Sequence, residues 1–243
     1  MGWTQNSSIA VFSTYDFKRF DANIPLIKGH NGSITDLGFS PFHETLLASA
    51  SEDGLVKLWV LPEEGLTEHI KEEDMELRGH TKKVLALRWH HIAENLMATY
   101  SFDNAVKIWD VSTGSASHSF TKLSNVPTAM QWSPKGNMLG LMLKGSTMTF
   151  MDPRVESSVL SGASHQGAKS QKLQWIDDEL IISAGFSKMN EREFGVWDLR
   201  QLEQGPVASG ALGDGTGIGH IYFDREHKLL FNAGRGDGSI QMF

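Results

Sequence analysis

The 243-residue chain is 40% hydrophobic, which is ordinary for a globular domain with a core, and it has no cysteine for disulfide or thiolate chemistry. No apolar run approaches the ~18 residues of a membrane span, and residues 1–18 do not resemble a signal peptide, so we expect a cytoplasmic protein. The net charge is −7, and residues 1–80 hold 13 acidic and 6 basic side chains against 16 of each in residues 81–243. Without a basic surplus, nucleic acid is not an expected partner.

The first elements along the chain are short predicted strands. Residues 9–12 resemble residues 56–59 and end at Phe12, so residues 1–28 are expected to be an incomplete unit. From residue 29 a full unit begins, with period-two alternation, a break at Ser40-Pro41 and a tight-turn signal at Glu52-Asp53-Gly54. The predicted strands of this unit cover residues 33–39, 46–50, 56–60 and 75–78. Four short strands in 40–50 residues are typical of a propeller blade.

The unit that begins at residue 79 repeats the previous one with a shift of 50 residues. Four residue types recur at this shift: His30, Ser49, Asp53 and Trp59 become His80, Thr99, Asp103 and Trp109. Each His follows a Gly, and the second Trp is followed by Asp110. A fixed period with a Gly-His opening and a Trp-Asp close predicts the WD40 type of β-propeller.

The four repeated residues can form a chain of hydrogen bonds that stabilises the sheet. A buried indole N–H needs an acceptor, and a Ser or Thr hydroxyl can accept from it while donating to an imidazole that in turn donates to Asp. We therefore expect two structural tetrads, and we expect no catalytic residues, because the Ser or Thr of each set lies inside the sheet.

The later units keep the period but lose parts of the set. Met151 takes the place of Trp, the unit opened by His165 closes at Trp197-Asp198, and the last one ends at Asp237 and Phe243. The prediction is one all-β WD40 propeller domain over residues 1–243, with four-stranded antiparallel blades, about five of them present. The expected limits are an incomplete first blade 1–28, full blades 29–78, 79–121, 122–161 and 162–211, and a last blade 212–243 that lacks its outer strand. These units total 21 strands, so either the chain is part of a seven-bladed ring, or a smaller ring closes when residues 24–28 complete the sheet that ends at Phe243.

Several segments resemble the coronin family. They are Pro25–His30, Ser40-Pro41-Phe42, Ala48–Asp53, Leu61–Thr67, Gly79–Val84, Trp89-His90, Asp152-Pro153-Arg154, Gly185–Glu193 and Gly234–Ile240. The segment Gly185–Glu193 is the most specific, because generic propeller repeats do not carry it. The resemblance covers roughly residues 7–243.

This resemblance implies a non-enzymatic, seven-bladed propeller protein that binds F-actin and organises the actin cytoskeleton, with other cytoskeletal proteins as further partners. It implies a cytoplasmic, cytoskeleton-associated location. The family's C-terminal coiled coil is not found here, since the chain has no heptad stretch. The alternative function is a WD40 adaptor that recognises a peptide or degradation signal in another protein complex.

Three surface features complete the sequence predictions. A candidate partner-binding rim consists of Lys82, Lys83, Lys188 and Arg192, which we expect on the edge of the propeller that carries the tetrad His and Asp. The acidic run between residues 63 and 76 is expected to be a solvated loop. No metal site or cofactor is expected, because His90-His91 has no third ligand at a suitable spacing.

Overall fold

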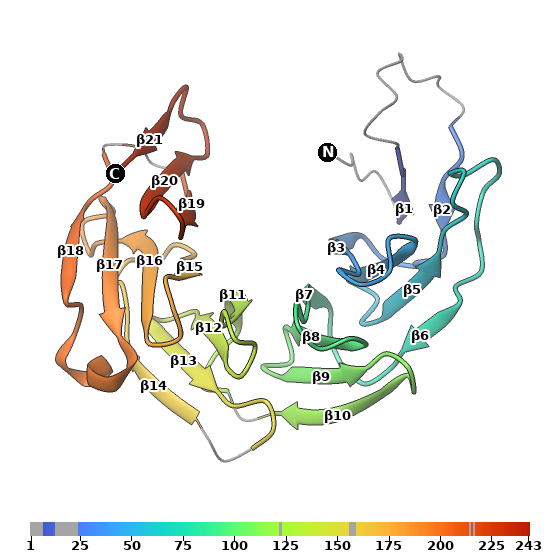
Figure 1. Ribbon diagram of the computed structural model, residues 1–243, viewed down its shortest axis with the longest axis horizontal. Coiled ribbons are helices and arrows are strands. Elements are labelled where there is room, and N and C mark those ends of the chain that lie inside the picture. Colours follow the sequence, from blue (N-terminus) through green and yellow to red (C-terminus); the bar gives the residue numbers. More distant parts are fainter. Residues whose placement is uncertain (1–6, 13–23, 122, 156–158, 214, 216) are drawn as a thin grey trace. The chain divides into compact units, whose positions relative to one another are not determined.

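The computed structural model describes residues 7–12, 24–121, 123–155, 159–213, 215 and 217–243. These residues form β-strands and one 3-10 helix, and the chain divides into two compact units, residues 1–122 and 123–243 (Figure 1). In the part of the chain that is described, no helix is long and apolar enough to cross a membrane.

The first unit contains three antiparallel sheets. β1 (Ser8–Ile9) pairs with β2 (Ile27–Lys28) rather than with a strand near Phe243. The two four-stranded sheets are meanders in chain order. Their strands are β3 (Ile34–Phe39), β4 (Leu46–Ser51), β5 (Val56–Val60) and β6 (Met75–Leu77), then β7 (Val84–Trp89), β8 (Leu96–Ser101), β9 (Val106–Asp110) and β10 (Ser115–Phe120).

The second unit repeats the same meander. Two four-stranded sheets are followed by a three-stranded one, all antiparallel (Figure 1). Their strands are β11 (Pro127–Trp132), β12 (Leu139–Leu143), β13 (Thr147–Met151) and β14 (Val159–Ala163), then β15 (Lys172–Trp175), β16 (Leu180–Phe186), β17 (Arg192–Asp198) and β18 (Ala208–Ala211), then β19 (Gly219–Asp224), β20 (Leu229–Gly234) and β21 (Ile240–Met242). The 3-10 helix η1 (Leu199–Gln204) lies between β17 and β18.

Burial follows the position of a strand in its sheet. The first strand of the sheet β3–β6 alternates buried and exposed residues, whereas β4 and β5 are buried on both faces. Three first strands share an irregularity, a register shift after Ile34, after Val84 and after Pro127. An extra residue at the start of a strand bends it and increases its twist, so the same local device shapes β3, β7 and β11.

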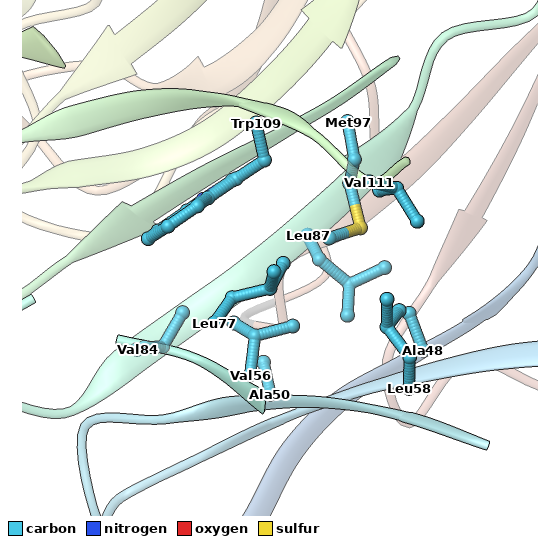
Figure 2. Packing of buried hydrophobic residues seen from close by; sticks show 10 residues of the cluster. All are labelled: Ala48, Ala50, Val56, Leu58, Leu77, Val84, Leu87, Met97, Trp109 and Val111. Atoms are coloured by element: carbon cyan, nitrogen blue, oxygen red, sulfur yellow. The ribbon is translucent and has the colours of Figure 1, made fainter. Parts of the chain in front are cut away.

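The core of the first unit lies between its two four-stranded sheets (Figure 2). The first sheet contributes Ala48, Ala50, Val56, Leu58 and Leu77, and the second contributes Val84, Leu87, Met97, Trp109 and Val111. Small residues face large ones across this interface, with Ala48 and Ala50 opposite the longer side chains of the next sheet. Close packing of this kind makes each blade depend on its neighbour for burial of apolar surface.

Tryptophan residues at the ends of first strands join neighbouring sheets within each unit. The Trp89 indole N–H donates to the Gly38 carbonyl at 2.8 Å, and the Trp175 indole N–H donates to the Gln131 carbonyl at 3.1 Å. Gly38 allows this approach, because a Cβ there would lie 2.9 Å from Leu87 Cδ1. These bonds fix β7 on β3 and β15 on β11.

Most of the acidic run is the solvated loop that the sequence predicts, but its last part also contacts a buried cation. The Lys57 side chain is only 8% exposed, and its ammonium lies 2.9 Å from a Glu73 oxygen and 3.7 Å from a Glu76 oxygen and donates to the Gly29 carbonyl. The hydrogen bond from Lys57 lowers the pKa of Glu73 below its usual value. Glu73 and Glu76 therefore neutralise a buried lysine. Amino-acid composition alone does not show that this lysine is buried.

A substitution at Leu87 tests how much the core between the two four-stranded sheets contributes to the free energy of unfolding. It is 1% exposed, so Leu87→Ala should lower the free energy of unfolding by about 2–5 kcal/mol through lost burial and a residual cavity. Urea denaturation followed by tryptophan fluorescence measures this change. Ile92→Ala is the control, because Ile92 is 55% exposed and its removal should change the free energy by less than about 0.5 kcal/mol.

Candidate functional site

The first tetrad is a continuous chain of hydrogen bonds inside the sheet β3–β6. The Trp59 indole N–H donates to Ser49 Oγ at 2.9 Å, and Ser49 Oγ lies 2.7 Å from His30 Nε2. His30 Nδ1 lies 2.9 Å from an Asp53 oxygen, which also accepts the Asn31 backbone N–H. Because Ser49 accepts from the indole, its own hydrogen is free to donate to Nε2, which leaves Nδ1 to donate to the carboxylate. The tetrad thus ties strands β4 and β5 to two loops.

The second tetrad repeats this geometry in the sheet β7–β10. Trp109 donates to Thr99 Oγ1 at 2.8 Å, Thr99 lies 2.8 Å from His80 Nε2, and His80 Nδ1 lies 3.1 Å from Asp103. The His and Trp rings meet edge to face at 6.3 Å in both sheets.

The protonation of the tetrads follows from burial. Burial lowers the pKa of His30 and of His80, and the neighbouring carboxylates offset only part of that effect. Burial alone would raise the pKa of Asp53, but the hydrogen bonds from His30 and from the backbone N–H of Leu55 outweigh it and lower the value. The stable form is therefore a neutral imidazole that donates to a carboxylate.

A third set, in the sheet β15–β18, was missed by the spacing argument. His165 Nε2 lies 2.7 Å from Ser183 Oγ, which accepts the Trp197 indole N–H at 2.7 Å, and His165 Nδ1 lies 2.7 Å from Glu193. The carboxylate comes from β17 rather than from the turn before it, so it lies four residues before Trp197 instead of six. A search for a His, a Ser or Thr and a Trp in this order would have identified His165, Ser183 and Trp197, provided that it did not require an Asp in the turn.

The other two sheets of the second unit are held differently. In β11–β14, the register places Met151 where the first sheet has Trp59 and Leu141 where it has Ser49, and both are buried, so apolar side chains replace the polar set. In the last sheet, Asp237 binds the guanidinium of Arg192 through both oxygens, and Arg192 Nε donates to the Gly217 carbonyl at 2.7 Å.

This ion pair corrects one residue of the predicted rim. Arg192 was expected to be an exposed basic residue, but it is 2% exposed and its charge is neutralised by Asp237. Its role in the structure is to join β17 to the connection between β20 and β21. A spacing argument could not detect this, because the partner lies 45 residues further along the chain.

The other rim residues are accessible. Lys82 is exposed and its carbonyl accepts the Ser101 hydroxyl, next to the turn that carries Asp103. Lys83 Nζ lies 3.4 Å from Glu52 and 5.2 Å from the centre of the Phe102 ring. In the second unit, Lys188 is exposed and lines a cavity of about 270 Å³ together with His165 and Glu193. Within each unit, these lysines thus lie near a tetrad.

The structure gives His90 a local role. His90 is buried, and its Nδ1 accepts the backbone N–H of Ile92 at 3.0 Å and of Ala93 at 2.7 Å, which fixes the turn after β7. Across the described residues, no group of three or more His, Cys, Asp or Glu side chains is arranged to hold a metal ion.

Comparisons with known proteins give the family. Residues 23–60 match the model of the WD domain, G-beta repeat, and residues 74–135 match that of the anaphase-promoting complex subunit 4 WD40 domain. The chain is 40% identical over 221 residues to Coronin-A of Dictyostelium discoideum, which covers 91% of this chain and 49% of that protein. It is 31% identical over 247 residues to a coronin-like protein of Saccharomyces cerevisiae, which covers 97% of this chain and 38% of that protein.

A solved structure agrees with these relatives. The WD40 domain of Toxoplasma gondii coronin superposes with a TM-score of 0.85 at 36% identity, over 90% of this chain and 57% of that chain. The chain belongs to the coronin family. The predicted all-β WD40 propeller fold is thereby confirmed, as a partial propeller that spans about half the length or less of the curated coronins it matches.

Ser49 tests the first tetrad. Ser49→Ala would leave the buried Trp59 N–H without its acceptor and His30 Nε2 without its donor, so the free energy of unfolding should fall by about 1–3 kcal/mol. Urea denaturation measures the loss. Ser33→Ala, at an exposed serine of the same unit, is the matched control and should leave the value unchanged. Equal effects of the two substitutions would contradict the role of the tetrad.

The tetrad imidazoles also predict how stability depends on pH. The pKa values of His30 and His80 are lowered in the folded state from 6.5, so the unfolded chain binds more protons as the pH falls below about 6.5. The stabilisation is complete above that pH and should decrease steadily between about pH 6.5 and 5. Urea denaturation at pH 7.5, 6 and 5 checks this, and His91→Gln, at an exposed histidine, should show the same dependence. Constant or rising stability on acidification would be the contrary result.

Proposed function

We propose that this chain is the propeller part of a coronin that binds actin filaments and contributes to the organisation of the actin cytoskeleton. The observation that carries the proposal is the similarity to coronins over nearly the whole chain, at 40% identity to Coronin-A. The segment Gly185–Glu193, which resembles coronins and not propellers in general, supplies His165 with the carboxylate of the third tetrad. In this proposal, the protein acts without catalysis, in the cytoplasm, as a rigid platform for its partners.

We further propose that five of the described sheets are blades of a seven-bladed ring, with the blade limits predicted from the sequence. The sheets β3–β6, β7–β10, β11–β14 and β15–β18 are the four full blades, and β19–β21 is the fifth. On this assignment, β1 and β2 belong to a further blade that precedes them.

The rim proposed for filament contact consists of Lys82, Lys83 and Lys188, now without Arg192. The three lysines lie near tetrads whose hydrogen bonds hold the underlying turns in place. A basic rim on a rigid support favours encounter with an acidic filament surface, and such steering weakens as salt is added.

The alternative function, an adaptor for a peptide or degradation signal, has one observation in its favour. Residues 74–135 match the anaphase-promoting complex subunit 4 WD40 model. That match covers a single blade and its surroundings, whereas the coronin relatives match over 91% and 97% of the chain, so filament binding is the stronger proposal.

Filament co-sedimentation tests the proposal. The chain should pellet with F-actin, and Lys83→Glu combined with Lys188→Glu should weaken pelleting about tenfold at low salt, because both rim charges are reversed. The melting temperature should stay within about 2 °C, since the substitutions are at accessible positions.

Lys135→Glu is the matched control for this experiment. The Lys135 side chain is 76% exposed and lies in the β11–β12 connection, between the first and second strands of its sheet. Lys188 lies between the second and third strands of the next sheet, and in a meander these two types of connection are at opposite ends of the strands. The control variant should pellet like the unmodified chain. Unchanged pelleting of the double variant would exclude the rim, and no pelleting by the unmodified chain would favour the adaptor function.

A further inference from the structure

The three sheets that contain a tetrad differ at one position, two residues before the tryptophan. The register makes this position equivalent in the three sheets, because it lies directly opposite the Ser or Thr that accepts the indole N–H. The residue is Lys57 in the first sheet, Lys107 in the second and Gly195 in the third. The first two sheets thus carry a long cationic side chain where the third carries only a hydrogen.

The lysine of the first two sheets lies against the tetrad. Lys57 Nζ donates to the Gly29 carbonyl at 2.9 Å, and Lys107 Nζ donates to the hydroxyl oxygen of Ser119 at 3.0 Å. Burial lowers the pKa of the histidine in both tetrads, and the charge of the neighbouring lysine lowers it further. An ammonium group is therefore a part of the structure next to each of these two tetrads.

The third sheet has a cavity at the equivalent position. Its volume is about 270 Å³, and it is lined by Gly195 and Trp197 of β17 and by Ser209 of β18. Gly195 and the indole are close together, because a Cβ at Gly195 would lie 2.8 Å from Trp197 Nε1. The space that a lysine side chain fills in the first two sheets is thus open in the third, and the Trp197 indole lies beside it.

Two residues around the cavity correspond to those that bind the lysines. Ser164 directly precedes the tetrad histidine, at the position whose carbonyl accepts from the lysine in the first sheet. Ser209 stands opposite Gly195, at the position whose hydroxyl accepts from the lysine in the second sheet. Both residues line the cavity. The third sheet therefore keeps two positions that bind a lysine ammonium, although its own residue at the lysine position is glycine.

The cavity also has a charged acceptor. Glu193 lines it, with a side chain that is 35% exposed and an oxygen 2.7 Å from His165 Nδ1. A hydrogen bond from a neutral imidazole leaves the carboxylate charged, so a cation placed beside it gains a charge-assisted hydrogen bond. Lys188 lines the cavity too, but it is exposed, and solvent weakens its repulsion of a second cation.

We propose that this cavity binds the side-chain ammonium of a lysine from a protein partner, which takes the place that Lys57 and Lys107 fill in their own sheets. The ammonium donates to the Ser164 carbonyl and to the Ser209 hydroxyl, and Glu193 balances its charge. A lysine fits better than an arginine, because the equivalent groups of the other sheets hold a compact ammonium and not a planar guanidinium. The inference goes beyond filament binding and does not depend on it.

An NMR titration of the whole chain tests the proposal. The probe is an end-capped pentapeptide with one lysine between glycines, and the signals are the indole N–H resonances, assigned by single Trp→Phe variants. The resonance of Trp197 should shift as the peptide is added. Those of Trp59 and Trp109 should stay in place, because their sheets already hold a lysine. The same peptide with norleucine instead of lysine should leave all three unchanged.

A pair of isosteric variants tests the charge. Glu193→Gln should weaken binding about tenfold, because it removes the charge while its amide oxygen can still accept from His165. Glu191→Gln is the matched control, since Glu191 is an exposed carboxylate two residues earlier that does not line this cavity. The control should bind like the unmodified chain, and the indole resonances of both free variants report whether the tetrads are intact. Equal binding by the two variants, or a response of Trp197 to the norleucine peptide, would overturn the proposal.

Spermidine separates a lysine of a protein from a free amine. Both present primary ammonium groups, so tighter binding of spermidine than of the peptide at the Trp197 resonance would replace the protein partner with a polyamine. The titration contains no actin, so a shift of Trp197 without filament pelleting would support the cavity and contradict the proposed function, and the reverse result would do the opposite.

Discussion

The buried indole N–H is the group on which the interior of these sheets depends. A tryptophan gives three of the sheets a large apolar side chain, but its N–H costs about 1–3 kcal/mol if it is buried without an acceptor. Ser49, Thr99 and Ser183 meet that requirement, and each then needs an acceptor for its own hydrogen, which a histidine supplies. The histidine in turn needs a carboxylate that accepts its Nδ1 proton, which comes from a turn in the first two sets and from β17 in the third. In the first two sets, a single donor in the core thus determines residues on two strands and in two loops.

The sequence predicts this chemistry where the spacing is regular. The sets that begin at His30 and His80 share a shift of 50 residues, and the hydrogen bonds of the two sheets correspond atom by atom. The set around His165 keeps the chemistry but takes its carboxylate from a strand, because geometry requires only that an oxygen lies near Nδ1. The spacing therefore depends on which segment provides the acid, and Glu193 on β17 makes the same contact at a different spacing.

Charges were harder to place from the sequence. Lys57 and Arg192 are both buried and neutralised by carboxylates, from the neighbouring strand and the loop before it for Lys57 and from the β20–β21 connection for Arg192. A list of basic residues cannot separate such structural cations from exposed ones. The strand order shows which of the exposed lysines lie together. Lys144 and Lys169 line the same cavity, whereas Lys135 lies in the β11–β12 connection, at the other end of the strands.

The bond from Trp89 to the Gly38 carbonyl has a consequence for how the chain is made. Its donor is 51 residues later in the chain than its acceptor, and the Trp175 bond to Gln131 runs in the same direction over 44 residues. During ribosomal synthesis, the acceptor strand therefore emerges before the tryptophan that fastens to it. In both pairs, the later sheet can therefore attach to a sheet that has already been synthesised once its own first strand is available.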